Sequence, residues 1–315
     1  MIKRKNLIVL VFIVLSGAVL RFYRLDRFPP SLFGDEVDVV YQAYSILKTG
    51  KDYSGNSWPV SFQSLADWRT PLLLYSTVPS IAIFGLNEWG VRLPPALFGI
   101  LTLPFLFLLV RKLFKNEDLA LIVTFSLAIS PWHLQYSRAA FEVSQMLFLI
   151  IAGLFFFLKG LEDWRYLIFA VIFLGLTPYS YNTAKFFLPV LILILLICFG
   201  KKLKRIDSKR LIVILAIFSL ILLPAAKDIF FGQGGNRFSI LSIFTDPTVV
   251  PQIGFDRQTD FVAGPKTKED IVGVVCLLYT SDAADELLCV VLGAPRIIKK
   301  KLITNYAAHR SNTLY

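Results

Sequence analysis

Charged residues are scarce in this chain of 315 residues: only 17% are Asp, Glu, Lys or Arg, whereas 56% are hydrophobic and 14% are aromatic. Soluble globular domains carry about 25% charged residues. The composition therefore excludes an ordinary soluble domain of this length, and we expect an integral membrane protein.

Cysteine and histidine are also rare, with three and two residues respectively. Cys198, Cys276 and Cys289 have no metal-ligand spacing, and three thiols form no even disulfide framework. The two histidines, His133 and His309, are too few for a His-rich metal centre. These absences exclude a disulfide-rich scaffold and a zinc-finger-like domain.

The formal net charge is +11, but the sequence lacks a single continuous stretch in which the basic residues gather. The basic residues stand in short segments between apolar runs, of which "MIKRK", "RKLFK" and "GKKLKRIDSKR" are the densest. Lys and Arg are retained in this way on the cytoplasmic side of membrane proteins. We therefore expect these segments inside the cell and no nucleic-acid partner.

About seven apolar runs are long enough to suggest membrane spans, some of them with tilt, because about 20 residues cross the hydrocarbon. The first follows "MIKRK" without a small-residue cleavage site, which predicts an uncleaved anchor. The predicted spans are Leu7 to Phe22, Leu93 to Val110, Leu119 to Ile129, Val143 to Leu158, Tyr166 to Thr177, Phe186 to Phe199 and Leu211 to Ala226.

Alternation of these spans places the loop 23–92 outside, together with "SPWHLQYSRAAFE" and "TPYSYNTAK". A further apolar segment, Pro71 to Phe84, would break the alternation if it crossed. It is short and contains Pro79, so we read it as a juxtamembrane or re-entrant helix in the first outer loop. The fold class expected is an all-α membrane protein built as a polytopic helical bundle.

The first outer loop opens with "GDEVD" and continues as an amphipathic pattern. Apolar side chains recur at helical spacing and Gly50 follows as a stop signal, which predicts an interfacial helix. Asp35 would be its N-cap, with Asp38 in a position like that of a capping box. The apolar positions are Val37, Val40, Tyr41, Tyr44 and Leu47.

Carboxylates and cations gather in the outward loops next to apolar spans. Such a set can bind an anionic lipid headgroup and carry acid–base chemistry beside it. Structural roles stay open: Asp35 as a cap, Glu36 as a solvated residue, Arg138 and Lys185 reaching to headgroups, and Glu142 paired with Arg138 one turn before it. The candidates are Asp35, Glu36, Arg69, Arg138, Glu142, Lys185 and Arg237.

Over about residues 1–250 the sequence resembles the dolichyl-phosphate-mannose protein mannosyltransferases of glycosyltransferase family 39, including bacterial members that use polyprenyl-phosphate sugars. The resemblance rests on the order of "GDE", "WRTP", "FGLNEWGVRLPPALFGILTLPFLFLLVRKLF" and "SPWHLQYSR". It implies a GT-C fold of about seven spans with juxtamembrane helices in the first outer loop, in the cell membrane, with a cytoplasmic N-terminus.

The resemblance also implies an activity: transfer of a sugar from a polyprenyl-phosphate donor to a protein, lipid or glycan acceptor at the outer face, with inversion. Asp35 matches the family's essential first-loop aspartate and would be the base, and Glu142 matches its second acidic position. Glu36 joins them as a catalytic candidate. Cations would hold the lipid phosphate, so no metal is required, although Asp35 with Glu142 could bind a divalent cation; these cations are Arg69, Arg138, Lys185 and Arg237.

The end of the chain departs from this pattern. "CLLYTSDAADE" resembles a translated sequencing adapter, and the family's C-terminal spans do not follow. We expect a membrane module over 1–270, a foreign tail over 271–315, and a chain that is a fragment of a longer protein. Two other functions stay open: a flippase or transporter for a lipid-linked sugar, and a non-catalytic membrane subunit.

Overall fold

The computed structural model describes residues 3–64, 67–203 and 206–232. The predicted module boundary at residue 270, the tail 271–315 and the candidate Arg237 lie outside the described residues. Ten helices and one two-stranded hairpin are seen in this part of the chain: α1 (Arg4–Phe22), α2 (Gly34–Thr49), β1 (Phe62–Ser64), β2 (Asp67–Arg69), α3 (Pro71–Phe84), α4 (Glu88–Phe114), α5 (Glu117–Ile129), α6 (Pro131–Arg138), α7 (Glu142–Gly160), α8 (Arg165–Ser180), α9 (Ala184–Leu203) and α10 (Ser208–Phe231).

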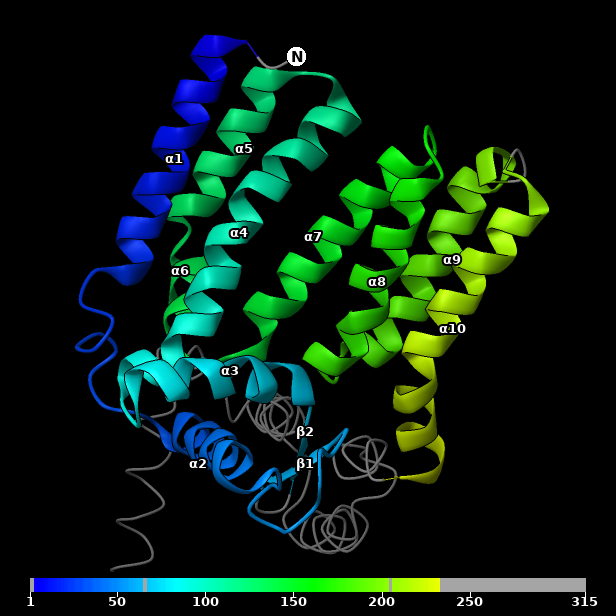
Figure 1. The fold of residues 1–315 in the computed structure, drawn as a ribbon. Helices are drawn as coiled ribbons and strands as arrows, with labels where there is room; N and C mark the ends of the chain where they lie inside the picture. Colours follow the sequence, from blue (N-terminus) through cyan, green and yellow to red (C-terminus); the bar gives the residue numbers. More distant parts are fainter. Residues whose placement is uncertain (1–2, 65–66, 204–205, 233–315) are drawn as a thin grey trace, which may run out of the picture. The chain divides into compact units, whose positions relative to one another are not determined.

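The helices α1, α4, α5 and α7 to α10 run up and down side by side, and each contains one predicted span (Figure 1). Helices α2 and α3 lie across one end of this bundle with the hairpin, and we call that the site end. The opposite end, at the top of Figure 1, is called the basic end. It is formed by the terminal turns that carry Arg4, Lys5, Arg111, Lys112, Lys201, Lys202, Lys209 and Arg210.

Five of these helices are long and apolar enough to cross a membrane: α1, α4, α7, α9 and α10. Helices α5 and α6 together make a sixth candidate, bent by 55° at the break before Pro131. Helix α8 is apolar but has only 16 residues, and α3 is likewise one of the shorter apolar helices. The chain is thus a multi-pass helical membrane protein, as expected, while the count of seven crossings stays a prediction.

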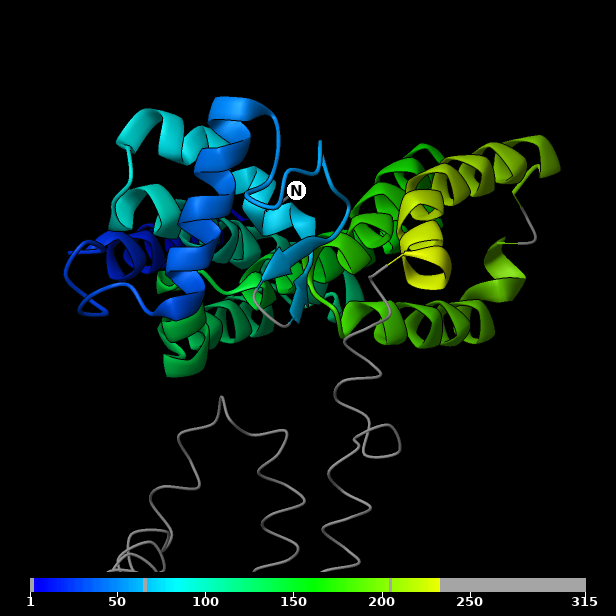
Figure 2. The same ribbon diagram turned by 90° about the horizontal axis from the view of Figure 1, so that it is seen from below.

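The bundle consists of two groups of helices that meet at α4 and α7. Apolar side chains of α1, α4 and α5 form one core around Phe107, and those of α7 to α10 form another around Leu174. The Phe148 ring on α7 contacts Phe98 and Phe105 of α4 and Phe173 of α8, so aromatic packing joins the groups. Figure 2 shows the two groups from the site end, with the N-terminal helices at left and the C-terminal ones at right.

Helix α2 ends where the sequence predicts, because Gly50 adopts the left-handed conformation with φ 69° and its N–H donates to the carbonyl of Ile46. Its start differs from the prediction. The N-cap position belongs to Phe33, no side chain caps the helix, and Asp35 stands within the first turn. Asp35 is therefore not an N-cap, which leaves its carboxylate for other partners.

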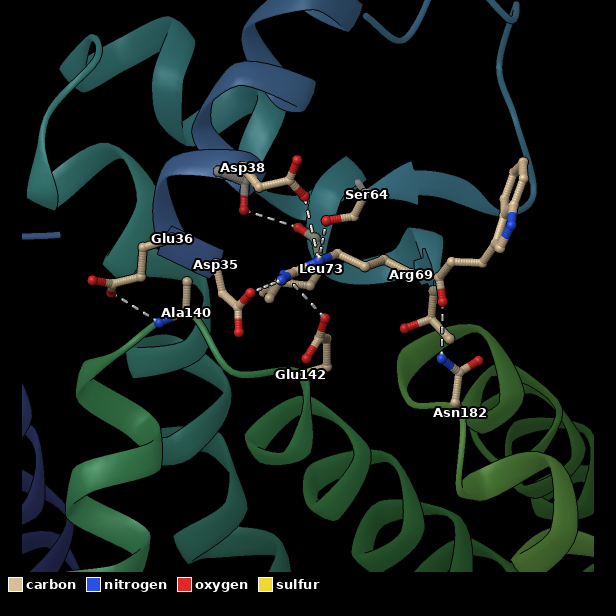
Figure 3. A network of polar contacts seen from close by, with 12 residues as sticks. Asp35, Glu36, Asp38, Ser64, Arg69, Leu73, Ala140, Glu142 and Asn182 are labelled. Atoms are coloured by element: carbon tan, nitrogen blue, oxygen red, sulfur yellow. Dashed lines mark hydrogen bonds and ion pairs between the residues drawn. The ribbon is translucent and has the colours of Figure 1, made fainter. Parts of the chain in front are cut away.

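One face of α2 packs on α3 and α4 through Val39, Val40, Ala43 and Ile46. Four of the five apolar residues that define the predicted face lie elsewhere on the helix and remain exposed: Val37, Tyr41, Tyr44 and Leu47. The packed face thus holds α2 rigidly over the bundle, and its first turn lies at the site end beside the start of α7 (Figure 3).

Candidate functional site

Four side chains from three separate parts of the chain meet at the site end (Figure 3). Arg69, the last residue of β2, extends its guanidinium between Asp35 and Asp38 of α2 and Glu142 at the start of α7. The Nη2 atom forms an ion pair with Asp35, Nε lies 3.3 Å from a carboxylate oxygen of Asp38, and Nη1 lies 3.8 Å from one of Glu142. One guanidinium thus gathers three carboxylates, and we call these four residues the Arg69 cluster.

The carboxylates of the Arg69 cluster differ in their access to solvent. The Asp35 side chain is 52% exposed, whereas those of Asp38 and Glu142 are 16% and 17% exposed and that of Arg69 is 11% exposed. Asp35 and Asp38 share a face because three residues make almost one helical turn. Asp35 is therefore the carboxylate of the cluster that a bound molecule reaches most directly.

The hairpin sets the position of Arg69. Phe62 pairs with Arg69 and Gln63 with Trp68 in an antiparallel register, and Arg69 Nε donates to Ser64 Oγ across the hairpin at 3.2 Å. Pro71 then begins α3 at its first position, where the missing N–H costs no helical hydrogen bond. The strand pair and the start of α3 thus fix the backbone before and after Arg69.

Further bonds tie the hairpin to the connection between α8 and α9. The side-chain amide of Asn182 donates to the carbonyl of Trp68 at 3.1 Å, and the Thr70 hydroxyl donates to the carbonyl of Ser180 at 2.8 Å. Lys185 lies three residues after Asn182, in the first turn of α9, and is half-buried. The predicted candidate Lys185 is thus at the same end of the bundle as the Arg69 cluster.

Glu36 faces away from the cluster, into the protein. Both its oxygens bind Arg92 of α4, at 2.9 Å from Nε and 2.8 Å from Nη2, and both side chains are fully buried. The same carboxylate accepts the N–H of Ala140 at 3.1 Å, two residues before Glu142. The expectation that Glu36 is solvated or catalytic is corrected, because it has no surface that a substrate can touch.

Arg138 also has a role other than the one expected. Its guanidinium donates to the carbonyls of Leu20 at 2.5 Å and of Tyr23 and Phe28 at 2.9 Å each. These carbonyls belong to the end of α1 and the chain that follows it. Arg138 therefore fastens α6 to α1, whereas Arg69 is a cation that lies beside Glu142.

The sequence did not predict the roles of two residues at the site end. Asp38, expected only as a capping residue, belongs to the Arg69 cluster, and Arg92, for which no role was expected, is the buried partner of Glu36. The i, i+3 spacing of Asp35 and Asp38 was a signal for the first, and the charged residue in the apolar "VRLPP" was one for the second. Within the described residues, no group of three or more His, Cys, Asp and Glu side chains could hold a metal ion. The positive charge among the carboxylates is that of Arg69.

Comparison with family models identifies this architecture. The model described as Dolichyl-phosphate-mannose-protein mannosyltransferase matches residues 69–226, half of the chain. The match begins at Arg69 and includes Glu142, Asn182 and Lys185.

Curated proteins with similar sequences are glycosyltransferases by name. Dolichyl-phosphooligosaccharide-protein glycotransferase 2 of Pyrococcus furiosus is 30% identical over 126 residues, which are 37% of this chain and 16% of that protein. The putative mannosyltransferase YkcB of Bacillus subtilis is 24% identical over 255 residues, 76% of this chain and 34% of its own length. The chain thus spans about a sixth to a third of these relatives.

Solved structures share the fold at low sequence identity. The S. cerevisiae protein O-mannosyltransferase Pmt1–Pmt2 complex bound to the sugar donor matches with a TM-score of 0.56 and 18% identity, over 72% of this chain and 33% of that one. ArnT from Cupriavidus metallidurans bound to undecaprenyl phosphate gives 0.54 and 20%, over 71% and 43%. AglB from Archaeoglobus fulgidus, in complex with an inhibitory peptide and a dolichol-phosphate, gives 0.56 and 21%, over 96% and 39%.

The family match over residues 69–226 and the fold shared with the solved structures agree with the helical bundle described above. The chain belongs to the dolichyl-phosphate-mannose-protein mannosyltransferase family and has the GT-C fold of membrane glycosyltransferases.

Proposed function

We propose that the protein is a membrane glycosyltransferase that moves a sugar from a polyprenyl-phosphate carrier to an acceptor hydroxyl or amine. The observation that carries this proposal is the Arg69 cluster, in which one half-exposed carboxylate, Asp35, is fixed beside a guanidinium at one end of a membrane bundle. A scaffold subunit has no task for such a group. A flippase would require charges near the middle of broken spans, whereas these charges stand at the helix ends.

Asp35 is the proposed general base. The acceptor oxygen or nitrogen attacks the anomeric carbon, its proton passes to an Asp35 oxygen, and the bond from that carbon to the phosphate oxygen breaks. A correctly placed base contributes about 10²–10⁴-fold to such a step. One displacement by an external nucleophile inverts the configuration at the anomeric carbon.

Arg69 acts as a positioning residue in this proposal, which revises its expected role in binding phosphate. Three carboxylates against one guanidinium leave a formal charge of −2 in the Arg69 cluster. A surplus of negative charge repels a phosphate. The guanidinium instead holds Asp35 and Glu142 at fixed positions, and such rigid placement is what catalysis requires of a base.

The lipid phosphate is assigned to Lys185, which is held at the site end by the bonds of Asn182 and Thr70 to neighbouring segments. An ammonium beside the leaving phosphate favours the charge that grows as the bond breaks. Arg138 is already bound to backbone carbonyls, and Arg237 lies outside the described residues.

The proposed substrates follow from what the similar structures bind. Those proteins hold a sugar donor, undecaprenyl phosphate or dolichol-phosphate according to their descriptions. We therefore propose a polyprenyl- or dolichyl-phosphate sugar as donor and a protein, lipid or glycan as acceptor. The basic end would face the cytoplasm by the positive-inside rule, which puts the Arg69 cluster at the outer face of the cell membrane.

The test is a transfer assay in liposomes with polyprenyl-phosphate sugars and hydroxyl acceptors on the outside. The proposal expects a glycosylated acceptor whose anomeric configuration, read by NMR, is opposite to that of the donor. Movement of the labelled donor between leaflets without transfer would instead identify a flippase. Retention of configuration would overturn the single displacement.

A further inference from the structure

A cavity lies at the basic end, at the other end of the bundle from the Arg69 cluster. Its volume is about 880 Å³, within the usual range for ligand sites. The last turns of α4, α7 and α9, the connection between α7 and α8, and the start of α10 surround it. The connections of the two helix groups therefore leave a space at this end.

The charged residues that line the cavity are mainly basic. Lys112, Lys115, Lys202 and Arg210 face Glu162 and Asp207, which gives the lining a formal charge of +2. Lys112 Nζ lies 2.5 Å from a Glu162 oxygen. The hydrogen bond from Lys112 lowers the pKa of Glu162, and the charges of Lys112, Lys202 and Lys115 add to the effect. Three ammonium groups thus converge around a single exposed carboxylate.

The rest of the lining is apolar and aromatic. The Arg210 guanidinium lies 5.2 Å from the centre of the Trp164 ring, and Lys202 Nζ lies 5.9 Å from that of Phe199. From the cavity, α9 and α10 continue with exposed aliphatic side chains, since only 11% of the apolar window of each helix is buried. A ligand here meets cations at one end and the exposed apolar faces of α9 and α10 at the other.

We propose that this cavity binds the phosphate headgroup of an anionic glycerophospholipid from the leaflet at the basic end, with the acyl chains along α9 and α10. Basic pockets between membrane helices at the cytoplasmic side recognise such headgroups, and each basic residue near the surface contributes about 1 kcal/mol. The site is separate from the proposed catalytic centre and does not rest on the proposed function. The phosphodiester of the lipid binds Lys115, Lys202 and Arg210. The Glu162 carboxylate competes with the phosphodiester for Lys112.

The experiment titrates the purified full chain, in neutral detergent, with a fluorescent phosphatidylglycerol and, in parallel, a fluorescent phosphatidylcholine. The Lys115→Asn/Lys202→Gln variant removes two exposed cations. Asn suits position 115 because Lys115 has φ 54°, a conformation that Asn tolerates. The matched control, Arg4→Gln/Lys5→Gln, removes two exposed cations at the same end that do not line the cavity.

The proposal expects phosphatidylglycerol to bind more tightly than phosphatidylcholine, the double variant to weaken it about 30-fold, and the control variant to bind like the parent. Glu162→Gln should tighten binding about fivefold, because Lys112 becomes an additional cation for the headgroup. Loss of folding cannot produce these opposite changes. Equal binding of the two lipids, or an unaffected double variant, would overturn the site. Displacement of the lipid by inorganic phosphate alone would show instead a site for free phosphate.

Discussion

Glu36 and Arg92 form a two-point ion pair with no exposed surface on either side chain. Arg92 also donates to the carbonyls of Leu25 and Pro29, at 3.0 and 2.8 Å, and Glu36 accepts the N–H of Ala140. The pair therefore connects the start of α2, the chain after α1, the start of α4 and the segment before α7. Asp35 is adjacent to Glu36 in the sequence and Glu142 follows Ala140 by two residues, so this connection fixes the backbone that carries both carboxylates.

Glu36→Gln is expected to reduce the free energy of unfolding by about 3–5 kcal/mol, because it leaves the buried charge of Arg92 without its partner. Unfolding in a detergent titration measures the change. The matched control is Asp35→Asn, which removes the adjacent carboxylate and should cost less than about 1 kcal/mol because that pair is half-exposed. Equal stability of the two variants would contradict the structural role of Glu36.

Arg69→Lys is expected to lower sugar transfer by about 10²-fold, although the positive charge remains. An ammonium is a compact point charge and cannot face three carboxylates with three separate nitrogen atoms, and a small displacement of a catalytic group costs about this factor. Initial rates at saturating donor measure the effect. Arg27→Lys, at an exposed ion pair with Asp26, is the control; wild-type rates in Arg69→Lys would refute the positioning role.

Arg138→Gln is expected to lower stability by about 1.5–3 kcal/mol, because carbonyls at the end of α1 lose a charged donor. The KM for the donor should stay unchanged in the folded fraction. Melting curves and donor titrations measure the two quantities, with the exposed Lys48→Gln as control. A stable protein with a raised donor KM would restore the sequence-based view that Arg138 binds the lipid phosphate.

Topology reporters test the arrangement of α3. Fusions after Leu65 and after Trp89 should both report the outside, because α3 begins and ends at the site end (Figure 1). A fusion after Lys202 should report the inside, because Lys202 lies at the basic end. Accessibility to a membrane-impermeant reagent gives the answer. Opposite sides for the first two fusions would mean that α3 crosses the membrane.

The sequence alone predicted those features that depend on runs of similar residues. Apolar runs located the long helices, and Gly50 marked the end of α2. The basic segments proved to share one end of the bundle. Resemblance to a family supplied the fold class.

Contacts between distant segments escaped prediction. The packed face of α2 contains the polar residues Glu36 and Gln42 beside its apolar residues. The spacing of apolar residues in the sequence therefore predicted the wrong face of the helix as the packed one. Arg69 and its partner Glu142 are 73 residues apart in the sequence, and Arg92 and its partner Glu36 are 56 residues apart. Only folding brings these pairs together. Nothing in a local pattern reports such pairs.

The most direct test of the account is Asp35→Asn, measured for both transfer and thermal stability. Asn keeps the size of the side chain and can still accept a bond from Arg69, but it cannot take a proton from the acceptor. The account predicts a loss of transfer of at least about 10²-fold and a melting curve close to that of the parent, since the pair that it changes is half-exposed. A stable Asp35→Asn protein that transfers sugar at the parental rate would contradict the account.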